Sequence, residues 1–149
     1  MLKFEGDRDF ALAPADLWAK LTDPRFLVRC LPDVETVKES DAEHAAVVLR
    51  PSFAFVRGTL DMTMHVVDPI PPTAARVLVH SKGIGSSSTV EATLALNATA
   101  GGTRVHWTAE IKELGGLLKL IPSGLIRGAA QKVINDAWNL IEAKLKEGA

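Results

Sequence analysis

The chain has 149 residues, of which 47% are hydrophobic and 23% charged, a balance typical of a globular domain with a substantial core. Its net charge is −1 and its longest basic block is Lys144–Lys146, so the composition argues against a nucleic-acid-binding protein. A single cysteine, Cys30, excludes an intrachain disulfide, and the N-terminus lacks the profile of a signal peptide. No apolar run approaches the ~18–20 residues of a membrane-spanning helix. We therefore expect a soluble, cytoplasmic protein.

The first part of the chain predicts one strand and two short helices. Apolar and charged residues alternate over Leu2–Phe10, which is typical of a strand. Pro14 can begin a helix, because its fixed φ suits the first helical position, and Ala15–Leu21 continues that helix. The helix ends before Pro24, since the residue that precedes a proline avoids the helical region. Arg25–Leu31 predicts a second short helix.

The middle of the chain changes to a period of two, which predicts six further strands. Their expected ranges are Glu35–Ser40, Glu43–Arg50, Phe53–Val67, Ala74–Lys82, Ser87–Ala98 and Arg104–Glu113. Turns are expected at Asp68–Pro72, which holds three prolines, and at Ala100–Gly102. Because side chains alternate across a strand, the apolar residues of these strands share one face of the sheet.

The C-terminal stretch Gly115–Lys146 predicts a long amphipathic helix. Its apolar face is formed by Ile126, Ala130, Val133, Ile134, Ala137, Ile141 and Leu145. A helix that follows a run of antiparallel strands must bury such a stripe against the apolar face of the sheet. We expect an α+β fold that forms one domain over residues 1–149, with this helix lying across a curved antiparallel sheet.

The order of these elements resembles the helix-grip fold of the START-like (SRPBCC) superfamily, in which about seven antiparallel strands wrap a C-terminal helix. Ala13–Pro24 resembles the first helix of that superfamily. Four stretches are similar to its carbon monoxide dehydrogenase G-subunit family: Cys30–Glu35, Arg57–Leu60, Gly101–Trp107 and Leu114–Leu117. In the first of them, Asp33 replaces the glycine of the usual Leu-Pro-Gly sequence. The resemblance implies a role beside a molybdenum hydroxylase or a membrane electron acceptor.

Members of that family tied to carbon monoxide dehydrogenase often carry a C-terminal extension that helps membrane attachment. The present chain stops at Gly148-Ala149, directly after the expected helix. The resemblance therefore gives no expectation of a permanent membrane anchor.

The inward faces predict a noncatalytic carrier for a hydrophobic small molecule, a quinone, isoprenoid or lipid, held between sheet and helix. The sheet residues expected to line the site are Leu60, Met62, Met64, Val90, Leu94, Val105, Trp107 and Ala109. Those expected from the C-terminal segment are Leu118, Ile126, Ala130, Val133, Ile134 and Ala137. Filling of the core by Trp107 and the methionines is the alternative interpretation.

Two other functions stay open. A polyketide cyclase or dehydratase-like enzyme, which the superfamily also includes, would need an inward polar side chain such as Arg57, Arg76 or His80. A protein interaction module would have a solid interior. Because alternation seats no acid, base or nucleophile inside, we predict no catalytic residue, no cofactor and no metal site.

The remaining polar candidates favour structural roles. His44, His65, His80 and His106 lie on different strands without the spacing of metal ligands, although His65 and His106 would meet if their strands were neighbours. Cys30 follows Arg29, which could activate a thiol, but a small buried thiol is the favoured interpretation. Gly83–Ser88 resembles a phosphate loop in composition only, because a strand and not a helix follows it; we expect a mobile hairpin loop near the cavity mouth.

The segment Leu114–Ile126 is apolar on all sides, with Lys119 as its one charge and Pro122 as a helix break. One interpretation is a buried helix start packed on the two short helices. The other is a flexible lid at the entrance of the pocket that also makes transient contact with a membrane or partner surface.

Overall fold

The structure is a computed structural model in which residues 2–50 and 58–147 are described. Within them, seven strands form one antiparallel sheet of order β1-β7-β6-β5-β4-β3-β2. The strands are β1 (Leu2–Phe10), β2 (Val34–Ser40), β3 (His44–Leu49), β4 (Leu60–Ile70), β5 (Ala74–Gly83), β6 (Ser86–Thr99) and β7 (Gly102–Gly116). The helices are α1 (Pro14–Leu21), α2 (Pro24–Leu27) and α3 (Ser123–Glu147), with 3₁₀ turns η1 (Val28–Cys30) and η2 (Leu117–Leu120). The helix-grip fold is confirmed.

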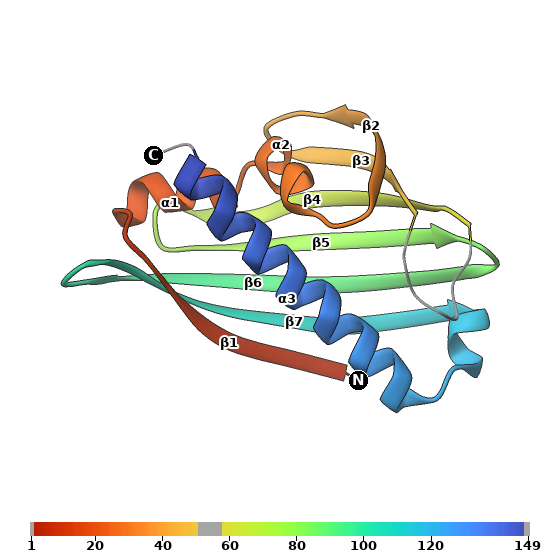
Figure 1. The fold of residues 1–149 in the computed structure, drawn as a ribbon. Coiled ribbons are helices and arrows are strands. Elements are labelled where there is room, and N and C mark those ends of the chain that lie inside the picture. Colours follow the sequence, from red (N-terminus) through yellow and green to blue (C-terminus); the bar gives the residue numbers. More distant parts are fainter. Residues whose placement is uncertain (1, 51–57, 148–149) are drawn as a thin grey trace.

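The long helix α3 runs obliquely over one face of the sheet (Figure 1). Its C-terminal end lies beside α1 and α2, and its first turn lies at the opposite end of the sheet, next to η2. The helices of the described residues all lie on this side of the sheet (Figure 1). The interior of the protein is thus bounded by α3 on one side and by the apolar face of the sheet on the other.

Several predicted boundaries are wrong. The expected helix from Gly115 starts only at Ser123, because Gly115 and Gly116 extend β7 by pairing with Ser87 and Ser86. The second short helix ends at Leu27 and continues as η1. The expected turn Asp68–Pro72 is shorter, since β4 runs to Ile70. The strand expected over Phe53–Val67 is described from Leu60 onward, and 53–57 lie outside the described residues.

The alternation of faces is confirmed for β4 to β7. Val77, Leu94, Leu96, Val105 and Trp107 are all buried on the face toward α3. The buried residues form two separate clusters. The larger joins β1, β6, β7 and α1 to α3, and the smaller lies under β3. One continuous core therefore does not extend under the whole sheet.

The C-terminal half of α3 is fixed by a residue that the predicted apolar stripe omitted, Trp138. Its side chain is 7% exposed, and its ring centroid lies 6.0 Å from that of Trp107 and 6.2 Å from that of Phe10. Gly6 makes room for this group, because a Cβ there would lie 3.0 Å from Cζ2 of Trp107. Arg8 also faces inward and donates to Glu142 at 3.1 Å, which joins β1 to α3.

Candidate functional site

A β-bulge in β7 determines which residues face the interior at the end of the sheet near η2. Thr89 pairs with Glu113, but the next residue, Val90, pairs with Ile111, so β7 contains one extra residue at this point. The bulge brings Leu114 to the same face as Ile111, although strict alternation would have turned it outward. Leu114 accordingly packs against the larger core cluster.

The segment after β7 folds back over the edge of the interior. Gly116 has φ of +61°, and its neighbour Leu117 donates its backbone N–H to the carbonyl of Gly85 at 3.0 Å. A side chain at residue 116 would overlap the Gly85 backbone, so the sharp turn into η2 requires glycine. η2 contacts β6 and β7.

The interpretation of Leu114–Ile126 as a fully buried helix start packed on the short helices is wrong. Leu117 is 55% exposed, Leu120 79% and Leu125 54%. Leu118, Ile121 and Ile126 instead pack against the core. The segment is therefore divided into an inner apolar side and an outer apolar side, and the outer side has no protein partner among the described residues.

An apolar cavity of about 410 Å³ lies beneath this segment. Its lining residues are Leu2, Ile111, Leu114, Leu118, Lys119, Ile121, Ser123 and Ile126. They come from the start of β1, the end of β7, η2 and the first turn of α3. Most of these side chains are aliphatic, and none is an acid, a histidine or a thiol. Its polar lining residues are Lys119 and Ser123, and the predominantly aliphatic lining suits an apolar ligand.

The predicted lining residues are distributed over the whole interior. Leu94, Val105, Trp107 and Ile126 are buried in the larger cluster, Val90, Ala109, Leu118, Ala130 and Ile134 are half-buried against it, and Leu60 and Met62 pack on the smaller one. Met64 is buried, and Val133 and Ala137 are half-buried, outside both clusters. Of all of them, Leu118 and Ile126 line the cavity.

Sequence reasoning missed four aliphatic residues of the cavity, Leu2, Ile111, Leu114 and Ile121. Alternation placed Ile111 on the inward face, and the apolar segment contained Leu114 and Ile121. The sequence pattern therefore marked these three residues as candidates for the interior. Their convergence was not predictable, because it depends on the bulge in β7 and on the turn into η2.

Of the three polar residues suggested for the enzyme alternative, the two that the structure describes, Arg76 and His80, do not face this interior. Arg76 lies on the outer face of β5, with Nη1 at 2.7 Å from Asp68 and Nε at 3.0 Å from Glu91. His80 is exposed on the same face, and its Nδ1 lies 3.1 Å from the hydroxyl of Thr89. Arg57 lies outside the described residues.

The histidines form no common site. β4 and β7 are separated by β5 and β6, so His65 does not meet His106. His65 stacks on His44 instead, with ring centroids 5.5 Å apart. The hydrogen bond to Glu39 and the charges of Glu39 and Asp41 raise the pKa of His44. Among the described residues, no group of three or more His, Cys, Asp or Glu could hold a metal ion.

Cys30 is 1% exposed in the larger cluster, as the favoured interpretation predicted. Burial raises the pKa of its thiol to about 11, although Arg29 and Lys144 act in the opposite direction. A thiol with such a pKa is protonated at neutral pH, so activation by Arg29 is wrong.

The hairpin expected over Gly83–Ser88 is present and connects β5 to β6 through a tight turn. Ile84 and Gly85 have φ of +56° and +67°, as a two-residue turn of the mirror-image type requires. The carbonyl of Gly85 binds η2, so the turn lies beside the segment that covers the cavity.

The described part of the chain contains no helix long and apolar enough to cross a membrane. No curated protein matches the sequence. Solved structures do match, and at identities below 25% they show the fold alone.

Three of these structures illustrate the likeness. A conserved protein from Geobacillus kaustophilus is 23% identical, with a TM-score of 0.85, and the match covers 98% of this chain and 96% of that protein. A protein from Chromobacterium violaceum is 16% identical, with a TM-score of 0.68 over 95% of each chain. The AHSA1 protein from Silicibacter pomeroyi is 16% identical, with a TM-score of 0.67 over 99% of this chain and 100% of that protein.

The family described as the G subunit of carbon monoxide dehydrogenase (CoxG) matches residues 6–146. This range includes the bulge, η2 and nearly all of α3. The chain therefore belongs to the CoxG family.

Proposed function

We propose that the protein is a noncatalytic carrier that binds a hydrophobic small molecule, a quinone, isoprenoid or lipid, between the sheet and the start of α3. The apolar cavity of about 410 Å³ is the observation that carries this proposal. Ligand sites of proteins typically measure about 300–1,000 Å³ and are lined mainly by apolar side chains. The half-buried residues Val133 and Ala137, outside both core clusters, would extend the site along α3.

The enzyme alternative receives no support from the polar residues that it needs. Arg76 and His80 face the opposite side of the sheet from the cavity and are occupied by Asp68, Glu91 and Thr89. The solid interaction module is disfavoured by the cavity itself. The CoxG family is named for a component of carbon monoxide dehydrogenase, which supports a role beside a molybdenum hydroxylase.

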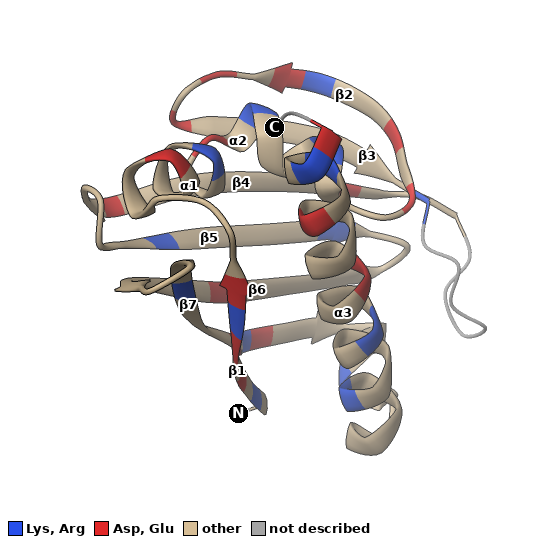
Figure 2. Cartoon of the chain, turned by 60° about the vertical axis from the view of Figure 1, so that its left-hand side comes forward, with Lys and Arg blue, Asp and Glu red and all other residues tan. Residues whose placement is uncertain are grey.

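We also propose that the outer side of the covering segment makes transient contact with a membrane surface. Leu117, Leu120 and Leu125 provide exposed apolar side chains beside the cavity. Residues 114–135 include three basic residues and no acidic one, although the chain as a whole has a charge of −1. The first half of α3 accordingly shows basic positions without acidic ones (Figure 2). Exposed leucines flanked by positive charge are the features of a segment that binds anionic lipid.

Mass spectrometry of small molecules extracted from the natively purified protein tests the carrier function. We expect a hydrophobic molecule in a stoichiometric amount, absent from the extract of the same protein purified after denaturation. An empty protein that also fails to bind a hydrophobic dye would contradict the proposal and favour an interaction module.

A further inference from the structure

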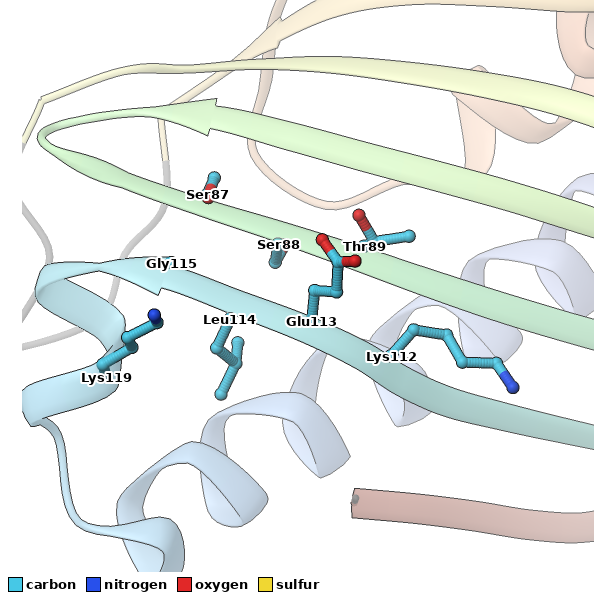
Figure 3. Close-up of a pocket in the computed structure, with 8 residues that line it drawn as sticks. All are labelled: Ser87, Ser88, Thr89, Lys112, Glu113, Leu114, Gly115 and Lys119. Carbon is cyan, nitrogen blue, oxygen red and sulfur yellow. The ribbon is translucent and has the colours of Figure 1, made fainter.

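A second, polar cavity of about 380 Å³ adjoins the apolar one. Figure 3 shows its lining residues, Ser87, Ser88, Thr89, Lys112, Glu113, Leu114, Gly115 and Lys119. Leu114 and Lys119 line both cavities. The two spaces therefore meet at these residues, with aliphatic side chains on one side of the junction and hydroxyl and charged groups on the other.

Lys119 is the charged group at this junction that is available to a ligand. Lys112 is engaged, because its Nζ lies 2.6 Å from Glu110 and 3.9 Å from Glu91. Glu113 pairs in register with Thr89 on the outer face of the sheet, and it leaves β7 in the opposite direction from Leu114 (Figure 3). The ammonium group of Lys119 has no ion pair or hydrogen bond with any described residue.

In the polar cavity, Gly115 lies directly opposite Ser87 in the pairing of β6 with β7. A Cβ at residue 115 would overlap the hydroxyl of Ser87, so Gly115 leaves this hydroxyl accessible. Ser87 and Ser88 add further hydrogen-bond donors to the ammonium group. Hydroxyl donors in the same cavity as an ammonium group without an ion pair favour a ligand group with negatively charged oxygen atoms.

We propose that the ligand is an anionic amphiphile, whose apolar part lies in the cavity beneath η2 and whose carboxylate or phosphate head lies beside Lys119. This inference rests on the proposed carrier function and specifies the class of its ligand. Under this proposal, the protein prefers acidic lipids and isoprenoid phosphates to neutral quinones as ligands. The head need not be desolvated completely, because Lys119 is exposed.

Cis-parinaric acid and its methyl ester provide a matched pair of fluorescent probes with the same chain and different head charges. We expect the wild-type protein to bind the acid about fivefold more tightly than the ester, the ratio given by an exposed ion pair. Lys119→Met should remove this preference, so that acid and ester bind with the same affinity, and Lys119→Arg should retain it. Lys146→Met, at the far end of α3, is the control for the same change in net charge.

The outcomes separate the two proposals. If acid and ester bind equally to the wild-type protein, or if Lys119→Met keeps the preference for the acid, the anionic head is wrong and the carrier function stands. If neither probe binds to any variant, the carrier function itself is contradicted. Binding of inorganic phosphate without either probe would show an anion site and would likewise overturn the amphiphile proposal.

Discussion

The two ends of α3 are packed in opposite ways. At the C-terminal end, Trp138, Ile141 and Leu145 are buried in a cluster in which the ring of Trp138 packs against those of Phe10 and Trp107. At the other end, Ser123 and Ile126 line the apolar cavity, whereas Gly124 and Gly128 are exposed and a Cβ at either would have no heavy atom within 4 Å.

This difference implies that stability and ligand binding depend on different ends of α3. At the closed end, where α3 ends, the large rings of Phe10, Trp107 and Trp138 fill the space between helix and sheet. At the open end, where α3 begins, the first turn of the helix borders the apolar cavity. Changes at the closed end should therefore unfold the protein, and changes at the open end should alter binding at little cost in stability.

The largest effect is expected for Trp138→Ala. Removal of a buried indole that contacts Phe10 and Trp107 should lower the free energy of unfolding by about 3–5 kcal/mol. Urea denaturation followed by circular dichroism measures this loss. Leu125→Ala, at an exposed position of the same helix, is the control and should change the stability by less than about 0.5 kcal/mol. Similar losses for both variants would contradict the difference between the two ends.

The reaction rate of the Cys30 thiol measures how tightly the closed end is packed and requires no substitution. Because its pKa is raised from 9.0 to about 11, the folded protein should react with a disulfide reagent at least a hundredfold more slowly than the unfolded protein at the same pH. The unfolded thiol ionises more readily, so stability should be retained below pH 9.0 and fall as the pH rises toward about 11. Fast modification of the folded protein would show that the closed end opens.

The exposed leucines test membrane contact at the open end. The double variant Leu117→Ser/Leu120→Ser should lower the affinity for vesicles containing phosphatidylglycerol at least tenfold, because both apolar side chains are lost. Its melting temperature should stay nearly unchanged. Val37→Ser/Ile70→Ser removes two exposed apolar side chains elsewhere and is the matched control. Equal vesicle binding by both double variants would argue against the proposed surface.

A filled cavity should weaken ligand binding in a stable protein. Leu114→Trp places an indole into a space of about 410 Å³ and should reduce the affinity for parinaric acid methyl ester about fivefold. The free energy of unfolding should change by less than about 1 kcal/mol, since the cavity accommodates the ring. Leu125→Trp, which adds the same ring on the exposed side of the helix, is the matched control. Undiminished binding by Leu114→Trp would place the ligand elsewhere.

The smallest effect concerns the backbone of α3 at the open end. Gly128→Ala should raise the free energy of unfolding by about 0.5–1 kcal/mol, because glycine is unfavourable within a helix and a Cβ here meets no atom. Thermal denaturation provides the measurement. A decrease in stability would indicate that this side of α3 is closely packed.

Much of the fold was predictable because it depends on local periodicity. The alternation in β4 to β7 and the helical spacing after Ser123 are repeated over many residues, so one exception does not obscure either pattern. Trp138 was such an exception: it lies between Ala137 and Asn139, beside the stripe drawn through the aliphatic residues, yet its large ring reaches the core.

The position of Leu114 shows what could not be predicted from local periodicity. By itself, the sequence determined the helix-grip architecture, the inward apolar faces and the unusual apolar segment 114–126. The tertiary structure alone decided that a bulge turns Leu114 inward, that η2 folds onto the Gly85 turn, and that Lys119 lies between two cavities. These features depend on the pairing of β6 with β7 and on chain reversal at Gly116, contacts between distant residues that no periodicity encodes.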